Sequence, residues 1–164
     1  HALEDDEQAI IAKVGQAPNC PLFQAPTTPF CLEHVDYRLD NMLIDARTSP
    51  PGITVVDWQS VRLGKPMNDV AYFLGAGLVP ELRREVEKSI VRDYHRHLIA
   101  AGVEGYPWED CWIDYRKGSF SGFGVTVIAS MIVEETERGN EMFITMARRH
   151  ARHALDLGAA EFLS

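Results

Sequence analysis

Residues 34–58 read HVDYRLDNMLIDARTSPPGITVVDW. A polar segment leads into two short apolar runs, residues 41–44 and 53–56, and the residues between those runs are typical of turns. The pattern predicts a loop followed by a β-hairpin. Because antiparallel strands bring the start of the first strand beside the end of the second, Asn41 and Asp57 are expected to lie close together.

The residue types in this stretch suit the transfer of a phosphoryl group to an alcohol. Asp36 is the candidate base for the attacking hydroxyl group, and Arg38 can place a positive charge beside the transferring phosphate. Asn41 and Asp57 offer the neutral and charged oxygen atoms that Mg²⁺ prefers as ligands. His34 is expected to orient the loop by hydrogen bonding rather than to transfer protons. The stretch therefore predicts a Mg²⁺-dependent phosphoryl-transfer site.

Two other interpretations of the same residues are weaker. A His-x-Asp triplet is common, and a turn that contains Asp and Asn usually caps only its own backbone. A metal-dependent phosphohydrolase could use Asp36 and Asp57, but such sites usually add histidine or further carboxylate ligands. The five-residue spacing from Asp36 to Asn41, the hairpin and the terminal Asp57 together favour the phosphotransferase site.

The rest of the chain predicts a mostly helical α+β fold in one domain. Apolar residues at helical spacing indicate a short helix over residues 3–14, and the four prolines of residues 17–30 indicate an extended connector. Further helices are expected over residues 80–101, 108–115, 125–137 and 141–163. The expected parts of the domain, residues 1–164, are the helix and Pro-rich connector (1–33), the catalytic loop and one β-hairpin (34–57), and a helical substrate subdomain (58–164).

Composition excludes several classes of protein. The 164 residues carry a net charge of −8, which argues against a surface that follows nucleic-acid phosphates and is compatible with a cationic small substrate. No apolar run is long enough to cross a membrane, and the first residues lack the pattern of a signal peptide, so a soluble cytoplasmic protein is expected. The three cysteines lack the spacing of a zinc site and are expected to be free thiols.

The segments HVDYRLDN, residues 34–41, and VVDWQSVRLGKPMNDVAYFL, residues 55–74, resemble the C-terminal lobe of the aminoglycoside phosphotransferase and choline kinase superfamily. These enzymes are small-molecule relatives of protein kinases. The resemblance covers residues 25–80 well, and beyond them only the helical character agrees. It implies a kinase-like C-terminal lobe that uses ATP and Mg²⁺ to phosphorylate a hydroxyl group of a small molecule.

The resemblance also implies a role for individual residues. Asp36 corresponds to the catalytic base, and Asn41 and Asp57 correspond to the Mg²⁺ ligands. Asp69, which precedes the apolar run VAYFL, corresponds to a buried acid that braces the loop. Carboxylates late in the helical part often contact amino groups of the substrate in this superfamily, which makes Glu134 and Glu135 candidate substrate residues, with a solvated helix end as the simpler alternative.

The sequence departs from the family pattern at two positions beside the base. Val35 stands where the family usually has glycine, and a β-branched residue adopts a positive φ only at a cost. The loop is therefore expected to be strained or to have a different shape. Glu33 stands where an apolar strand residue is common, and its side chain is expected to face solvent, with an approach to the site as the alternative.

The larger departure is the missing nucleotide-binding part of a kinase. Only 33 residues precede His34, and they hold no glycine-rich loop and no strand lysine paired with a helix glutamate. The chain is therefore expected to be a fragment that binds ATP poorly without the N-terminal lobe of the same protein. A non-catalytic binding or interaction module with the same fold is the alternative.

Histidines and tryptophans elsewhere have simpler explanations than a site. His95 and His97 are expected at the surface, and His150 and His153 share a helix face with arginines, which disfavours metal binding. That basic face is expected to be solvated or to contact a lobe or second subunit, which leaves homo-oligomerisation open.

Trp58, directly after Asp57, could line the acceptor pocket but is expected to pack behind the loop. Trp108, Trp112 and Tyr115 fall at helical spacing and are expected to be core residues rather than a cage for a quaternary amine.

Overall fold

The computed structural model describes residues 3–132 and 136–164 and is mostly helical, as predicted. Its helices are α1 (Asp5–Gln16), α2 (Pro66–Gly77), α3 (Pro80–Ala100), α4 (Trp108–Gly118), α5 (Ser121–Ile132) and α6 (Glu137–Asp156). Its strands are β1 (Cys31–Glu33), β2 (Met42–Asp45), β3 (Gly52–Val55) and β4 (Arg62–Gly64). The described part of the chain holds no helix that is long and apolar enough to span a membrane.

The helix boundaries follow local signals in the sequence. Helix α3 has Pro80 in its first turn, where a missing N–H costs nothing, and it ends before Gly102, whose φ of 90° suits glycine. Helix α6 begins after Thr136, whose side chain accepts a hydrogen bond from the backbone N–H of Gly139. The helix predicted from residue 80 is therefore confirmed, and the last long helix begins four residues earlier than predicted.

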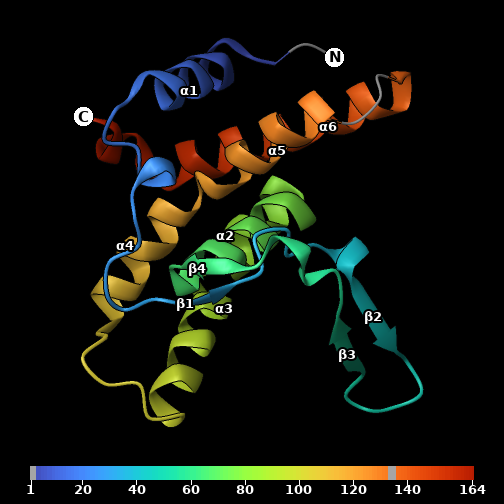
Figure 1. Cartoon of the computed structure of the whole chain (residues 1–164), viewed down its shortest axis with the longest axis vertical. Coiled ribbons are helices and arrows are strands. Elements are labelled where there is room, and N and C mark those ends of the chain that lie inside the picture. The colour runs from blue at the N-terminus through green and yellow to red at the C-terminus, as the bar shows by residue number, and fades with distance from the viewer. Residues whose placement is uncertain (1–2, 133–135) are drawn as a thin grey trace.

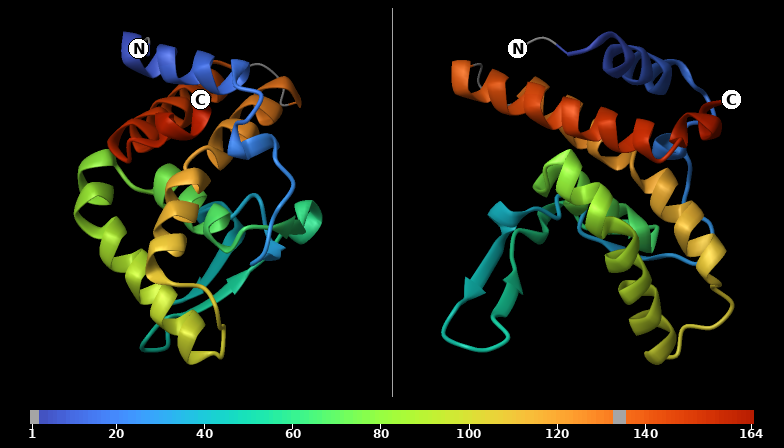
Figure 2. Two further views of the ribbon diagram at one scale, coloured as in Figure 1. Left: turned by 90° about the vertical axis from the view of Figure 1, so that its left-hand side faces the viewer. Right: turned by 180° about the vertical axis from the view of Figure 1, so that it is seen from behind.

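One layer of the molecule is formed by α1 lying across α6 and the end of the chain (Figures 1 and 2). Ile10 and Val14 of α1 pack in a buried cluster with Phe120, Phe123 and other apolar residues from α5, α6 and the last turn. The polar edge of this contact is ionic, because α6 places Arg152 beside three acidic residues of the N-terminal segment, Glu4, Asp6 and Glu7. This layer covers α6 on the side away from α2.

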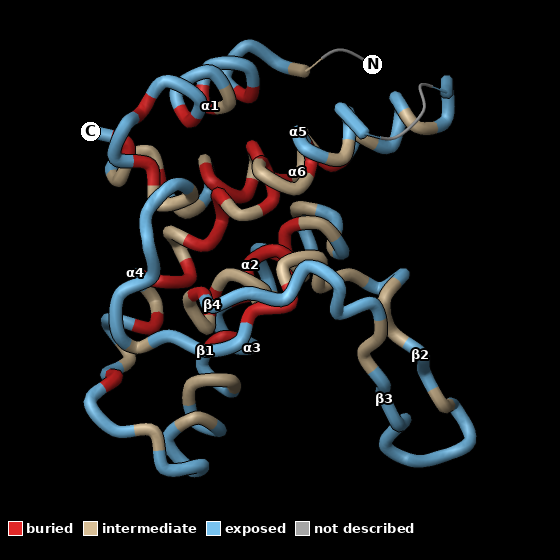
Figure 3. The backbone as a smooth tube through the Cα atoms, viewed as in Figure 1, coloured by how far each residue is buried: buried red, intermediate tan, exposed pale blue. Residues whose placement is uncertain are grey.

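A second layer is built around α2, which packs between α3, α4 and α6. Its buried residues Met67, Ala71 and Leu74 contact Val91 of α3 and Tyr115 of α4. Trp108 and Trp112 pack half-buried against the same cluster, so the aromatic stripe belongs to the core as predicted. Figure 3 shows that the buried residues concentrate along α2, α4 and α6. Helix α2 is thus the central element from which the neighbouring loop is held.

Two small antiparallel sheets lie beside the helices. The predicted hairpin is confirmed as β2–β3, with Met42 opposite Val55 and Asp45 opposite Gly52, and it projects away from the helices (Figure 1). The prediction of one hairpin missed the second sheet, in which Cys31 of β1 pairs with Gly64 of β4. Strands of three residues from distant parts of the chain show no periodicity that a local pattern could reveal.

The predicted connector and cysteines agree with the structure with one small difference. The segment after α1 is mostly extended, with a turn at residues 18–19 and one 3₁₀ turn at Pro21–Phe23, which four prolines did not exclude. Cys20, Cys31 and Cys111 are all free thiols, as predicted.

Candidate functional site

The loop at residues 34–41 is held in place by the first turn of α2. The two carboxylate oxygens of Asp69 accept hydrogen bonds from the backbone N–H groups of His34 and Val35, at 2.6 Å and 2.9 Å. Burial raises the pKa of Asp69, and the two N–H donors oppose that rise. The structure therefore brings Asp69 to the loop in the position that the sequence resemblance implied.

Val35 adopts the backbone conformation that its side chain disfavours. Its φ is 76°, in the left-handed region, where a β-branched residue is strained by about 1–3 kcal/mol. The expected strain is present, but the hydrogen bond from Val35 N to Asp69 holds the loop in this shape. The loop thus keeps a glycine-like backbone without a glycine.

The carboxylate of Asp36 is fixed at both of its oxygen atoms. The Asn41 side-chain amide donates hydrogen bonds of 2.9 Å to Oδ2 and to the backbone carbonyl of Asp36. The hydroxyl group of Tyr72, on α2, donates to Oδ1 over 3.1 Å. Sequence reasoning missed Tyr72, although its place in the apolar run VAYFL, three residues after Asp69, was a signal that it faces the same side of the helix. Asp36 is thus pre-oriented by groups from two elements.

Asn41 and Asp57 lie at adjacent ends of the hairpin strands, because the backbone N–H of Val56 donates to the carbonyl of Asn41 over 2.9 Å. Asp57 is exposed and adopts a left-handed backbone with φ 63° and ψ 57°. Among the described residues, no hydrogen bond or ion pair uses the Asp57 carboxylate or the Asn41 Oδ1 atom. These free oxygens are the hard donors that suit Mg²⁺, so the two residues fit this ion.

The described residues hold no larger cluster of protein ligands for a metal ion. In residues 3–132 and 136–164, no three His, Cys, Asp or Glu side chains gather in a group that could hold a metal ion. A site of the kinase type does not require such a group, because an amide, one carboxylate, phosphate oxygens and water can complete the coordination of Mg²⁺.

His34 and Trp58 support the loop from behind. The Nε2 atom of the buried His34 shares a hydrogen bond with the Val56 carbonyl over 2.9 Å, which ties the loop to the end of β3. The indole of Trp58 packs edge-on against the His34 ring, with 4.8 Å between the centroids, and its N–H donates to the Val55 carbonyl. Trp58 thus contacts the loop through His34, while 49% of its surface stays exposed.

A cavity of about 480 Å³ lies between the loop, α2 and α6. Its lining includes Arg38, Leu39, Tyr72, Met142, Met146 and Arg149. The volume is within the range of small-molecule pockets, and more of its wall is apolar than polar. Arg38 reaches this cavity but forms an ion pair with Asp40. Asp36 itself does not line the cavity, but the lining residue Tyr72 donates to it, so one side chain links the cavity to the candidate base.

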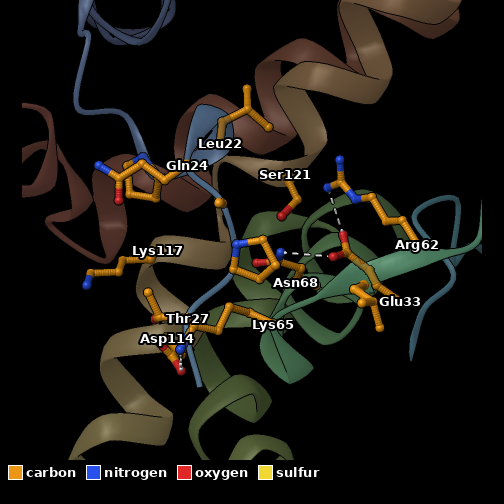
Figure 4. A pocket seen from close by; sticks show the side chains of 15 residues that line it. Leu22, Gln24, Thr27, Glu33, Arg62, Lys65, Asn68, Asp114, Lys117 and Ser121 are labelled. Atoms are coloured by element: carbon orange, nitrogen blue, oxygen red, sulfur yellow. Dashed lines mark hydrogen bonds and ion pairs between the residues drawn. The ribbon is translucent and has the colours of Figure 1, made fainter. Parts of the chain in front are cut away.

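Glu33 was predicted to face solvent, and this prediction was wrong. Its side chain is 2% exposed and accepts hydrogen bonds from Arg62 over 3.0 Å and Asn68 over 3.2 Å. It lies at the wall of a separate cavity between the connector, β4 and α4, and Figure 4 shows both interactions. Pairing of β1 with β4 turns Glu33 inward, and the short β4 strand that supplies this pairing was not predicted.

His150 and His153 were expected on a basic face, and the structure corrects this expectation. Both are fully buried between α6 and α2, while the neighbouring Arg152 points to the acids of the N-terminal segment. Burial lowers the pKa of His150 to about 3 and also lowers the pKa of His153. The two histidines are therefore neutral core residues.

The remaining predicted residues lie away from the loop or outside the described part. Glu134 and Glu135 fall within residues 133–135 and are outside the described residues. His97 is exposed and His95 is half-buried, with its Nε2 atom hydrogen-bonded to the Tyr106 carbonyl. The structure thus brings together His34, Asp36, Asn41 and Asp69, with Arg38 at the edge of the adjoining cavity.

Comparison with known proteins identified one matching protein family. The model of the ecdysteroid kinase-like family matches residues 5–102, which is more than half of the chain. The matched segment contains the loop, the hairpin, α2 and α3. No curated protein and no solved structure gave a significant match.

Proposed function

Because this chain belongs to the ecdysteroid kinase-like family, which is related to the aminoglycoside phosphotransferase and choline kinase superfamily, we propose that it transfers the γ-phosphoryl group of ATP to a hydroxyl group of a small molecule. The observation that carries the proposal is the Asp36 carboxylate. It is hydrogen-bonded at both oxygens, and Tyr72, which donates one of these bonds, also lines a cavity of about 480 Å³. A carboxylate fixed in this way can accept a proton from an acceptor hydroxyl group bound in that cavity.

In the proposed reaction, Asp36 accepts the hydroxyl proton as the acceptor oxygen attacks the γ-phosphorus of ATP, the bond from that phosphorus to the bridging oxygen breaks, and ADP leaves. Arg38 would leave Asp40 and place its charge beside the transferring phosphate, as an exposed ion pair exchanges partners at little cost. Asn41 and Asp57 would hold Mg²⁺ through the Asn41 Oδ1 atom and the Asp57 carboxylate. The bound ion would neutralise phosphate oxygens.

The lining of the cavity suggests a different acceptor from the cationic one that is compatible with the net charge of −8. Three arginines, Arg38, Arg138 and Arg149, and two acids, Asp40 and Glu141, line the cavity together with apolar side chains, so its wall carries a small net positive charge that does not attract a cation. We therefore propose an uncharged acceptor with an apolar body. The family is named for its likeness to ecdysteroid kinases, so an ecdysteroid is the first acceptor to test.

We also propose that the chain is the C-terminal lobe of a kinase-like fold and that a nucleotide-binding lobe of the same protein packs against the hairpin. The support is the exposure of apolar hairpin residues: Leu43, Ile44 and Ile53 are each 57–61% exposed. Apolar side chains gathered on one projecting element are typical of a surface that another part of the protein covers. On this basis, the isolated chain should bind ATP weakly.

The proposal is tested by Asp36→Asn in the natural full-length protein. Phosphorylation of an ecdysteroid panel should fall by about 100-fold or more, because an amide cannot accept the proton. Exposed Asp110 on α4 provides the matched control, since Asp110→Asn changes one carboxylate far from the loop and should leave turnover unchanged. Normal turnover of the Asp36 variant would show that the proposed base is wrong.

A non-catalytic binding module is the second candidate, and the observation that favours it is the strained φ of 76° at Val35. Titration calorimetry of the full-length protein with ATP and Mg²⁺ separates the two functions. Binding of ATP with phosphorylation of an acceptor supports the kinase, whereas absence of Mg²⁺-dependent binding supports the module.

A further inference from the structure

A line of buried aromatic contacts connects Asp36 to helix α6. Tyr72 is 1% exposed, and its ring is parallel to that of His150, with 5.5 Å between the centroids and 9° between the planes. His150 is fully buried, and neither of its ring nitrogens has a hydrogen-bond partner among the described residues. A buried polar ring without partners lowers stability, so hydrogen bonding within the core does not explain it.

The space around His150 leaves its ring little freedom. A Cβ atom on Gly122 would lie 2.1–2.2 Å from three atoms of the His150 ring, and one on Gly75 would lie 2.9 Å from its Nδ1 atom. Both distances are below any normal contact, so the backbones of α5 and α2 close directly on the imidazole. His150 is therefore a rigid support on which the Tyr72 ring rests.

The hydroxyl group of Tyr72 has a defined direction of hydrogen bonding. Burial and the nearby charge of Asp36 raise the pKa of Tyr72, so the phenol stays protonated and donates to Asp36 Oδ1. Asn41 donates to the other oxygen, Oδ2, and the carboxylate plane is therefore set by two donors. Rotation of this plane would move the oxygen that must face the acceptor hydroxyl group.

We propose that Tyr72 is a positioning residue for phosphoryl transfer, which orients the Asp36 carboxylate, and that His150 acts through Tyr72 by holding its ring. The proposal rests on the function proposed above, with Asp36 as the base. It makes α6, which also lines the acceptor cavity, part of the support of the catalytic loop. A change in α6 that moved His150 would then alter turnover without changing the contacts of the protein with ATP.

The test uses Tyr72→Phe in the natural full-length protein, with ATP and an ecdysteroid as acceptor. We expect kcat to fall by about 10- to 100-fold, while the KM for ATP changes by less than about threefold, because only the orientation of the base is lost. Tyr106→Phe is the matched control: Tyr106 is also buried and donates to a carboxylate, that of Asp114, over the same 3.1 Å. Equal losses of kcat in the two variants would overturn the proposal.

A double-mutant cycle tests the part of His150. His150→Asn alone should lower kcat by about three- to tenfold, and in the Tyr72→Phe background it should lower kcat by less than twofold, because the hydroxyl group it serves is already absent. Independent losses that multiply would contradict the role of His150.

The failure of the inference and that of the proposed function can be told apart. Full activity of Tyr72→Phe, in a protein whose wild type phosphorylates the acceptor, would overturn the inference alone. A wild type that phosphorylates no acceptor would overturn the proposed function. In that case a cycle of Tyr72→Phe and Asp36→Ala, read by thermal unfolding, still tests the hydrogen bond, and additive changes in Tm would show that it does not form.

Discussion

The loop at residues 34–41 and the β2–β3 hairpin are consecutive in the chain but are held in opposite ways. The loop is tied to the helical core through Asp69 and Tyr72 of α2, and its residues are buried or half-buried except for Leu39 and Asp40, which are exposed. The hairpin projects from the core, and its residues are mostly exposed (Figures 1 and 3). Its exposed apolar residues lie on both faces, with Leu43 on one face and Ile44 and Ile53 on the other. The loop is therefore held by the described core, whereas the hairpin leaves apolar side chains exposed.

The largest expected effect is loss of the tie between the loop and α2. Asp69→Ala removes both acceptors of the His34 and Val35 N–H groups, and hydrogen bonds to a charged group contribute about 1.5–3 kcal/mol each. We expect the free energy of unfolding to fall by about 3 kcal/mol, measured by urea denaturation, and phosphoryl transfer by about 100-fold or more. Without these hydrogen bonds, the strained positive φ of Val35 is no longer stabilised by α2.

Asp69→Asn provides the graded control for this prediction. The amide keeps one acceptor oxygen, so an intermediate loss of stability is expected. If Asp69→Ala were as stable as the parent, the loop would be held by the hairpin rather than by α2, and the contrast between the two regions would fail.

The second effect is a dependence of stability on pH that comes from the buried histidine His150. His150 has a pKa of about 3 when folded and an ordinary value of 6.5, so between these values the unfolded chain binds the proton more readily. Its contribution to stability is complete above pH 6.5 and is lost as the pH falls toward 3. The expected loss is about 1.4 kcal/mol for each pH unit within this window.

Replacement of the titrating ring measures this contribution. His150→Asn should reduce the slope of unfolding free energy against pH between pH 6.5 and 5 by about 1.4 kcal/mol per unit, whatever its effect at pH 7. An unaltered slope in the His150 variant would mean that this histidine is not held neutral in the folded protein.

Local patterns in the sequence predicted most of this arrangement. The hairpin followed from two apolar runs around a turn, α3 followed from its spacing and from Gly102, and the loop residues followed from the distance between Asp36 and Asn41. Each of these signals lies within about twenty residues of chain, where periodicity and turn chemistry act.

Contacts between distant segments were the ones that sequence reasoning missed. Glu33 is buried because β1 pairs with β4, about thirty residues later in the chain. His150 and His153 were judged by the arginines beside them in sequence, but Arg152 turns to α1 while the histidines turn to α2. One helix thus carries a charged side and a buried side, and only the packing of α1 and α2 decides which residues lie on each.

The smallest expected change in the isolated chain concerns the hairpin. Ile44 and Ile53 lie opposite each other across the two strands and are more than half exposed. Replacing both with threonine keeps the preference for a strand and removes little buried area, so the free energy of unfolding should change by less than about 0.5 kcal/mol per residue. Urea denaturation of the isolated chain provides this measurement.

The same pair of substitutions should have a much larger effect in the natural full-length protein. If a nucleotide-binding lobe covers this face, each threonine removes apolar contact with it, and the KM for ATP should rise about tenfold while the KM for the acceptor is unchanged. Leu43 lies on the opposite face of the hairpin, so Leu43→Thr reports which face is covered. Leu82→Gln on the exposed surface of α3 is the control for a general loss of apolar surface. Unchanged affinity for ATP in all three variants would mean that the exposed hairpin contacts no nucleotide-binding surface, and the difference between loop and hairpin would then be one of packing alone.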